Sequence, residues 1–586
     1  MVDIKRLKKR KNTLKQLFNK FQTGLVIVVI TILVLISTRF LMSLTGFSPH
    51  SLFGEQYNFE EFKEMLGIRM RFKKRWKMIQ ESIGFDKKNI CVGGADPDTL
   101  SIKEYVKAFA EGPCSPTILV PGLNGSWLHI LIDCEILRRT DPDIFKTCGW
   151  NTCKKHWPII NWFWRSPKKE YRIWTPLTKE PFSLIPVYKN TKKCFMALFK
   201  PHLKISKEGV ELVEKPGAKI KPFGITPETR SRKVSDCGTK AMDNATPTAL
   251  KIRGTEFEYL TALSKAYEFL GFKSGLSFQP YPFDFRLGFS EGDSTTRLIK
   301  IFKELNNMFG KKSMIIGHSL GNNFVVKTLW DMPQELKDQT VARYIAIAPP
   351  MMGVLHIVFG LLGFTDAFVT QMWGLEFGFD TEIKSKVLSN FGSYYQTFIK
   401  NTYQKHANEP YIKEILQRIE SERTGKAMPK ETIMDIFPPP SEVCVPFNPF
   451  RMTDKCNLGM DNDPIIAEIE GNKYTADEFS AMLEKYSFVE NAKQLYEHYQ
   501  DERFSSFPNP GVQTNLIFSN GFRTKYSFKF YSNPKPVSLK GQCYFPDEYK
   551  RVSGDGLVTS TSSLTPFIKW AHEFKMGKKT VILSIL

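Results

Sequence analysis

The stretch from Ser313 to Phe324 constrains this chain more than any other part of its sequence. An apolar run leads into Gly317-His318-Ser319-Leu320-Gly321, and a helix-like pattern follows. This is the G-x-S-x-G pattern of a nucleophile elbow, a turn so tight that only glycine leaves room on either side of the serine. It predicts a buried strand, a strained backbone at Ser319 and a helix whose N-terminus stabilises negative charge. The competing interpretation is an ordinary strand–helix connection in a parallel sheet.

Further strands and helices alternate along the chain, which predicts a mostly parallel α/β sheet. Apolar segments predict strands, and longer periodic segments predict helices. We expect strands at 117–121, 344–350, 512–519 and 580–586, and helices at 256–270, 291–309, 322–332 and 562–574. A hairpin is expected at 526–545. Residues 134–180 read as an insertion or lid, residues 200–250 as basic and loop-rich, and residues 353–500 as a helical and loop-like cap.

A serine nucleophile needs a base, a carboxylate that orients the base, and donors for the oxyanion. Proteins with this elbow carry the three groups in the order serine, acid, histidine. Asp555, between two glycines, suits the acid, although an Asx-type surface turn explains the same residues. The backbone N–H groups of Leu320 and Leu123 are the expected oxyanion donors. His318 precedes the nucleophile and points elsewhere, so we interpret it as structural.

Five motifs in register carry a family resemblance: Val120–Ser126, Tyr281–Arg286, Gly317–Asn322, Ala348–Pro350 and Gly554–Val558. From about residue 110 the chain resembles the lecithin:cholesterol acyltransferase family, which includes phospholipid:diacylglycerol acyltransferases and lysosomal phospholipase/transacylases. The resemblance implies an α/β-hydrolase fold at 111–586, with a lid insertion at about 129–180 and a cap insertion at about 353–505.

The resemblance also implies site residues and substrates. Ser319 is then the nucleophile, Asp555 the acid, and Leu123 and Leu320 the oxyanion donors. Phospholipids are the acyl donors, and lipid alcohols or water the acceptors, with no cofactor. Three cysteines complete these implications: a disulfide from Cys134 to Cys148 or Cys153 staples the lid.

The base departs from the family pattern. His572 is the only histidine after Asp555 in the sequence, and it precedes the last expected strand instead of following it. Either His572 substitutes by an unusual path, or the sequence is incomplete at its C-terminus, or the protein is not a competent hydrolase. We expect an incomplete C-terminus, with His572 a solvated helix residue and not the base.

The N-terminal region predicts attachment to a membrane. Residues 1–20 carry eight basic and one acidic side chain, and an apolar segment follows at 24–37 within a candidate span at 21–44. The segment fits a transmembrane anchor or a cleaved signal sequence. The long basic lead and the lack of a small-residue cleavage site favour the anchor. Residues 45–110 then form a linker with a juxtamembrane helix, and the positive-inside rule places the tail in the cytosol and the body in the lumen or outside the cell. After signal cleavage the body is instead secreted.

The net charge and the cysteine content indicate which classes of binding partner and which compartment to expect. The net charge is +22, but no nucleic-acid recognition motif accompanies it, so anionic lipid headgroups explain the basic blocks better. Ten cysteines fit an oxidising compartment. Cys153 and His156 alone approach a metal-ligand spacing, and no second pair completes a site, so we expect no metal.

Two functions follow from this reading. The leading one is a membrane-tethered lipid O-acyltransferase or phospholipase that uses Ser319. The alternative is a catalytically silent lipid-binding protein that lacks the triad histidine.

Overall fold

The structure, a computed structural model, describes the body of the chain from Lys88 onward. The described residues are 88–123, 125–126, 128–146, 168–174, 194, 196–206, 209–222, 261–362, 369–372, 375–378, 387, 390–398, 410, 465–487, 489, 491–499, 508–518, 522–532, 547–575 and 584–585. The expected tail and the candidate span at 21–44 therefore lie outside the described residues. Among the residues that are described, no helix is both long and apolar enough to cross a bilayer.

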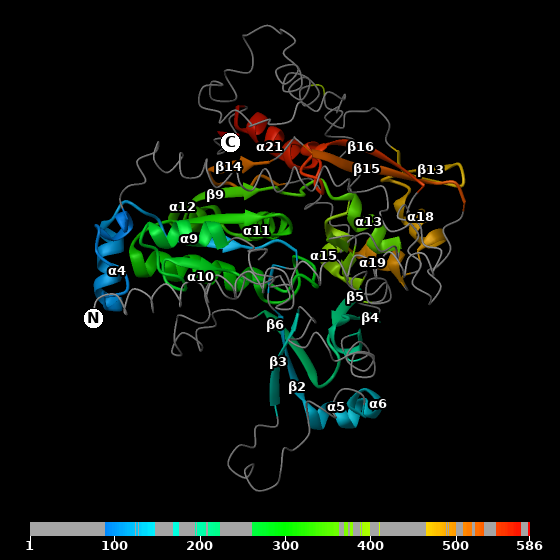
Figure 1. Cartoon of the computed structure of the whole chain (residues 1–586), viewed down its shortest axis with the longest axis horizontal. Coiled ribbons are helices and arrows are strands. Elements are labelled where there is room, and N and C mark those ends of the chain that lie inside the picture. Colours follow the sequence, from blue (N-terminus) through cyan, green and yellow to red (C-terminus); the bar gives the residue numbers. More distant parts are fainter. Residues whose placement is uncertain are drawn as a thin grey trace, which may run out of the picture. The chain divides into compact units, whose positions relative to one another are not determined.

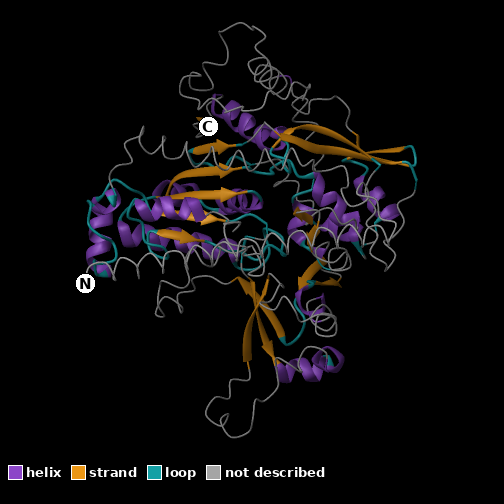
Figure 2. Ribbon diagram, in the orientation of Figure 1, coloured by secondary structure: helices purple, strands orange, loops and turns teal. Residues whose placement is uncertain are grey.

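A six-stranded sheet forms the centre of the larger of two compact units (Figure 1, Figure 2). Every neighbouring pair in it is parallel. Its order is β17 (Ser584–Ile585), β14 (Thr514–Ile517), β9 (Val341–Ile347), β8 (Ser313–His318), β1 (Thr117–Val120) and β7 (Phe278–Pro280). The central strands are apolar on both faces because helices cover the sheet, and all four residues of β1 are buried. The expected parallel α/β sheet is confirmed.

Helices connect successive strands of this sheet, as parallel pairing requires. The connecting helices are α9 (Thr261–Phe269), α10 (Ser294–Phe309), α11 (Leu320–Asp331), α12 (Gln334–Thr340) and α21 (Ser560–Lys575). α11 starts directly after β8 and packs beside both β8 and β1, so the turn between β8 and α11 lies at the middle of the sheet. This order of strands and helices fits an α/β-hydrolase-like fold.

Smaller sheets lie outside the central one. The antiparallel pair β15–β16 falls in the region where a hairpin was expected, whereas the other small strands lie in regions that we expected to be irregular or helical. A four-stranded sheet contains β13 (Asn472–Thr475), β12 (Ile465–Ile469), β15 (Phe522–Phe530) and β16 (Glu548–Gly554), in that order. A three-stranded antiparallel sheet contains β3 (Lys168–Trp174), β2 (Leu128–Asp133) and β6 (Ala218–Pro222), and β4 (His202–Ser206) pairs with β5 (Gly209–Val213). The description of 200–250 as loop-rich was therefore wrong over 202–222, where alternating apolar and basic residues form strands.

The remaining helices are short. They are η1 (Ile90–Val92), α4 (Ile102–Glu111), α5 (Cys134–Thr140), α6 (Pro142–Ile144), α13 (Leu355–Leu362), α15 (Gly392–Gln396), α18 (Phe479–Tyr486) and α19 (Ala492–His498). Residues 370–378 belong to the other compact unit, where β10 (Val369–Met372) pairs with β11 (Leu375–Gly378). The segment expected to form a helical cap thus contains helices, but also the strands β10, β11, β12 and β13.

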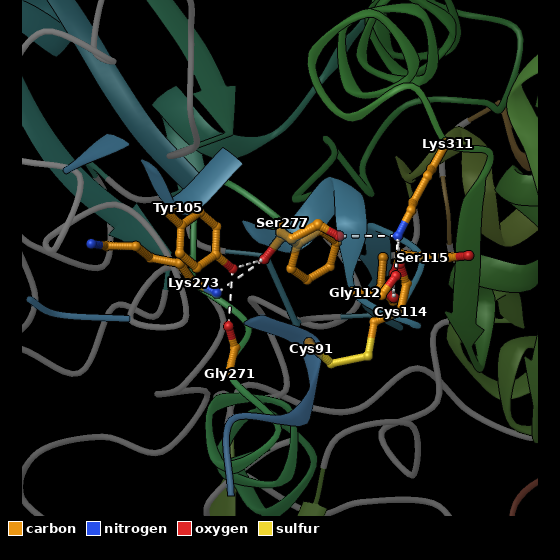
Figure 3. The surroundings of a disulfide bond; sticks show 11 residues. Cys91, Tyr105, Gly112, Cys114, Ser115, Gly271, Lys273, Ser277 and Lys311 are labelled. Carbon is orange, nitrogen blue, oxygen red and sulfur yellow. Dashed lines mark hydrogen bonds between the residues drawn. A yellow bond between two sulfur atoms is a disulfide. The ribbon is translucent and has the colours of Figure 1, made fainter. Parts of the chain in front are cut away.

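A disulfide that we did not predict joins Cys91 and Cys114 (Figure 3). It links η1 to the end of α4, and a side chain at Gly112 would clash with the carbonyl oxygen of Cys91. Lys311 caps the same helix end, because its ammonium group donates to the carbonyls of Phe109 and Cys114 at 3.0 and 3.1 Å.

Cys134 and Cys194 each take part in a disulfide. Cys148 and Cys153, the two partners proposed for Cys134, lie outside the described residues. The specific pairing therefore stays a prediction.

Candidate active site

Ser319 occupies a strained turn between β8 and α11. Its backbone has φ 48° and ψ −127°, in the region that residues other than glycine rarely adopt. Its N–H donates to the carbonyl of Ile347 at the end of β9, at 2.9 Å. The strained backbone that the G-x-S-x-G pattern predicts is therefore present, at the carboxyl ends of the central strands.

Three glycines make this turn sterically feasible. A side chain at Gly317 would clash with the Asn322 amide, and one at Gly321 would clash with the carbonyl of Pro121. A Cβ at Gly122, in the loop after β1, would lie 2.8 Å from the Cβ of Ser319. The elbow is thus packed directly against the loop that we expected to supply an oxyanion donor.

The two expected oxyanion donors lie on either side of this contact. Leu320 is the first residue of α11, and Leu123 belongs to a turn closed by a 3.0 Å hydrogen bond from the Gly125 N–H to the Gly122 carbonyl. In the described part of the chain, neither leucine N–H donates a hydrogen bond. The N-terminus of α11 also directs its partial positive charge toward Ser319. This arrangement can stabilise negative charge that develops beside the serine oxygen.

The loop after β1 is itself held by the Tyr281–Arg286 motif. The hydroxyl of Ser126 accepts from the N–H of Phe283 at 3.1 Å, in a buried position. Arg286 is only 1% exposed and pairs with Asp284 at 2.6 Å and with Glu214 at 3.1 Å. The motif therefore ties the site to the β5–β6 connection by buried, paired charges and does not add a reactive group to it.

His318, which we expected to be structural, lies beside Ser319 in the elbow and is largely buried. Burial lowers the pKa of His318 to about 4, so its ring is neutral near pH 7. A Cβ at Gly122 would lie 3.0 Å from its Nδ1 atom, which shows that the ring packs on the loop after β1.

Asp555 lies at the end of β16, in the four-stranded sheet. Its Oδ1 accepts from the N–H groups of Leu557 and Val558 at 2.8 and 2.7 Å, so the carboxylate closes a turn of the Asx type. Burial raises the pKa of Asp555, although these backbone N–H groups act in the opposite direction. Both interpretations offered for this residue remain open, because a carboxylate can hold its own turn with one oxygen and present the other.

The chain after Asp555 leads back to the edge of the sheet that carries Ser319. α21 begins at Ser560, and the hydroxyl of Ser562 accepts from the N–H of Met352 at 3.1 Å and donates to the carbonyl of Gly353 at 2.8 Å. Met352 and Gly353 belong to the loop after β9, the strand whose last carbonyl binds the Ser319 N–H. This chain of contacts brings the start of α21 to the carboxyl edge of the sheet.

His572 lies near the other end of α21. Ten residues separate it from Ser562, which corresponds to about 15 Å along a helix axis. The helix leads to β17, which runs parallel to β14 and therefore starts at the amino edge. The backbone topology thus favours the prediction that His572 is not the base, and the identity of the base stays a prediction.

Sequence reasoning missed two contributors to the elbow, Asn322 and Tyr344. Asn322 donates from its side-chain amide to the carbonyls of Ser319 and Ile347, both at 2.9 Å, and accepts from the Tyr344 hydroxyl at 2.9 Å. A polar residue two positions into an otherwise buried helical turn was the available signal. In the described residues, no group of three or more histidine, cysteine, aspartate or glutamate side chains could hold a metal ion.

This chain is similar to a protein of known sequence and to a solved structure. The bovine (Bos taurus) lysosomal phospholipase A and acyltransferase is 28% identical over 97 residues, which is 16% of this chain and 24% of that protein. The chain thus matches only about a quarter of that relative's length. The crystal structure of the Tle4-Tli4 complex aligns with a TM-score of 0.33 and 9% identity, over 80% of this chain and 91% of that chain.

The family comparison covers more of the chain. The pattern of the lecithin:cholesterol acyltransferase family matches residues 223–585, which include β7, β8, the elbow and the Asp555 loop. The Val120–Ser126 loop precedes this range, but β1 lies between β7 and β8 in the sheet and so belongs to the same fold. The chain belongs to the lecithin:cholesterol acyltransferase family.

Proposed function

We propose that this protein transfers a fatty acyl group from a phospholipid to a lipid alcohol or to water, with Ser319 as the nucleophile. The observation that carries the proposal is the backbone of Ser319, at φ 48° and ψ −127° between β8 and α11, in a chain of this family. A structure keeps such strain only where its surroundings enforce it, and strained residues cluster at active sites.

The proposed reaction has two halves. In the first, the Ser319 oxygen bonds to the ester carbonyl carbon while its proton moves to a base. The bond from that carbon to the glycerol oxygen breaks, and the proton passes to the departing lysophospholipid. In the second half, the oxygen of an alcohol or water attacks the acyl-serine, gives up its proton through the base, and restores the Ser319 hydroxyl.

The other site residues have proposed roles in both halves. The N–H groups of Leu123 and Leu320 stabilise the oxyanion, as the contact between Gly122 and Ser319 supports. Asp555 orients the positively charged base, as the return of α21 to the sheet edge supports. How well the acyl-serine is shielded from water decides whether water or a lipid alcohol accepts the acyl group.

We also propose where the reaction takes place. The basic tail and the segment at 21–44 attach the protein to a membrane, with the body in the lumen or outside the cell. The net charge of +22 supports contact with anionic lipid, and the Cys91–Cys114 disulfide supports an oxidising compartment. The substrates are then phospholipids of the same membrane surface.

Labelling with a fluorophosphonate, together with phospholipid turnover, tests the proposal. Wild-type protein should react at Ser319, where the serine oxygen bonds to phosphorus and fluoride leaves. It should release lysophospholipid from phosphatidylcholine vesicles. Ser319→Ala should abolish labelling and reduce turnover by about 10⁴-fold or more.

Ser313→Ala is the matched control for this experiment. Ser313 begins the same strand, is fully buried, and its hydroxyl has no hydrogen-bond partner among the described residues. This variant should label like wild type. Turnover that survives in Ser319→Ala would show that the elbow is only structural.

A second candidate function is lipid binding without turnover. The position of His572, about 15 Å along α21 from the residue that reaches the loop after β9, favours this candidate. A protein of this kind should bind phospholipid vesicles, fail to label with fluorophosphonate and release no lysophospholipid. The same experiment therefore separates the two candidates.

A further inference from the structure

The carbonyl group of Ser319 is held as firmly as its N–H. Two donors of a single residue converge on it: the backbone N–H of Asn322 and the side-chain amide of Asn322, both at 2.9 Å. The same amide donates to the carbonyl of Ile347, which also accepts from the N–H of Ser319. Asn322 thus joins the elbow to the end of β9 through a single side chain.

Tyr344 fixes the orientation of that amide. Its hydroxyl donates to the Oδ1 atom of Asn322 at 2.9 Å, so the NH₂ group must face the two carbonyls. Neither Asn322 nor Tyr344 is exposed to solvent at all. Because hydrogen bonds in such a dry site are strong and cannot be replaced by water, this network should resist relaxation of the turn.

The network acts against a specific distortion. Ser319 would relax from its positive φ if its two peptide groups were released, and its hydroxyl would then turn away from the oxyanion donors. Steric packing by Gly122 and Gly321 limits where the serine can go. It does not by itself hold the peptide groups on both sides of the residue, and Asn322 contacts the one that follows it.

We propose that Asn322, oriented by Tyr344, is the positioning residue that keeps the Ser319 hydroxyl in its reactive conformation. This inference rests on the proposed function of Ser319 and adds the reason why the serine stays poised. Asn322 touches no substrate in this proposal and acts only through the backbone of Ser319.

The variants that test the proposal change one contact at a time. Asn322→Ala removes the amide. Asn322→Asp keeps the shape but turns a carboxylate oxygen toward two carbonyl oxygens. Tyr344→Phe removes only the hydroxyl that orients the amide. Asn323→Ala is the matched control, because Asn323 is the next residue of α11, is equally buried, and contacts the carbonyl of Pro350 at 3.4 Å instead of the elbow.

The readout is the rate of fluorophosphonate labelling at Ser319, resolved into the maximal rate constant and the half-saturating concentration. Thermal unfolding is measured for every variant. We expect Asn322→Ala to lower the maximal rate constant by 10- to 100-fold at an unchanged half-saturating concentration. Asn322→Asp should lose at least as much, and Tyr344→Phe about threefold. Asn323→Ala should label at the wild-type rate even if it melts at a lower temperature.

Two results overturn the inference alone. One is labelling of wild type at Ser319 together with a maximal rate constant for Asn322→Ala that lies within twofold of the wild-type value. The other is an equal slowing of Asn323→Ala at the same loss of melting temperature, which would make the effect one of stability. Failure of wild type to label at Ser319 would instead overturn the proposed function, and the inference with it.

Discussion

The loop that carries Ser319 and the loop that carries Asp555 are both tight turns that require glycine, but different surroundings hold them. Gly321 and Gly122 pack across two adjacent strands of the central sheet, β8 and β1. Gly554 packs against the side chain of Thr524 within its own β15–β16 hairpin. The central six-stranded sheet therefore determines the shape of the elbow, whereas the four-stranded sheet determines the shape of the Asp555 loop.

This difference separates what each side chain has to do. Ser319 makes its turn with backbone groups only, which leaves the hydroxyl available for chemistry. Asp555 makes its turn with the carboxylate itself, so the same oxygen that builds the loop cannot serve a base without sharing. Local packing holds the proposed nucleophile in place, whereas the position of a whole hairpin determines where the proposed acid lies.

Asp555 closes its own turn and is proposed to orient the base. The largest effect that separates these two roles is expected from Asp555→Asn. Asparagine keeps an acceptor for the N–H groups of Leu557 and Val558, so the free energy of unfolding should change by less than about 0.5 kcal/mol. The charge that orients the base is lost, so kcat/KM for phospholipid should fall by about 10³-fold. Asp555→Ala should show the same kinetic loss and an unfolding free energy lower by about 1–2 kcal/mol.

Kinetics and chemical denaturation of both variants check this prediction. Wild-type kcat/KM in Asp555→Asn would show that the residue is a turn residue only. The Asp555 loop would then differ from the elbow only in how it is folded, because it would have no role in the reaction.

A second prediction addresses the packing of the elbow. Gly321→Ala places a methyl group against the backbone of Val120 and Pro121, which cannot move without shifting β1, so we expect a loss of about 3 kcal/mol in unfolding free energy. Gly310→Ala is the control, because Gly310 ends α10 at φ 64° with nothing within 4 Å of the added methyl. Its cost is backbone strain alone, about 1 kcal/mol. Equal losses in the two variants, measured by denaturant titration, would mean that the elbow is not packed as described.

A third prediction concerns pH and His318. The folded pKa of His318 is about 4, below its ordinary value of 6.5, so the unfolded chain binds the proton first as pH falls. Stability from this residue is complete above pH 6.5 and is lost as pH falls toward 4. Allowing for partial exposure of the ring, we expect a loss of roughly 1–2 kcal/mol over that window.

The difference between wild type and His318→Gln at each pH isolates this contribution. Burial raises the pKa of Asp555, Glu214 and Glu291, and these carboxyls act in the opposite direction in both proteins. A pH-independent difference would show that the ring is not desolvated.

The sequence predicted the central sheet and the elbow because their signals are local. An apolar strand, two glycines around a serine and a helical period are contained in a dozen residues, and the steric reason for them is visible in Gly321. The strands over 202–222 alternate apolar and basic residues, and that alternation was a usable signal that the high charge obscured.

Contacts between segments that are distant in the sequence could not be predicted. The Cys91–Cys114 pairing depends on how α4 and η1 pack, and the spacing of cysteines does not specify their partners. The hydrogen bond from Tyr344 to Asn322 joins a strand to a helix, and neither residue signals the other in sequence. β12 pairs with β15, for example Ala467 with Phe528. β13 pairs with β12 on its other side, so a segment expected to be helical carries both strands.

The smallest effect is expected from His572→Ala, and it bears on the comparison most directly. If the Asp555 loop serves a base, that base must come within about 3 Å of the serine oxygen when substrate is bound. α21 starts at the loop after β9 and leads away from it toward β17, which takes the backbone of His572 about 15 Å along the axis from Ser562. A histidine side chain does not span such a gap, so we expect His572→Ala to change fluorophosphonate labelling and phospholipid turnover by less than threefold.

A loss of about 10³-fold, together with the disappearance of the acidic limb of the pH–rate profile, would make His572 the base. Asp555 and His572 would then form a working pair at the two ends of one short connection, and the hairpin that places Asp555 would be part of the catalytic machinery after all.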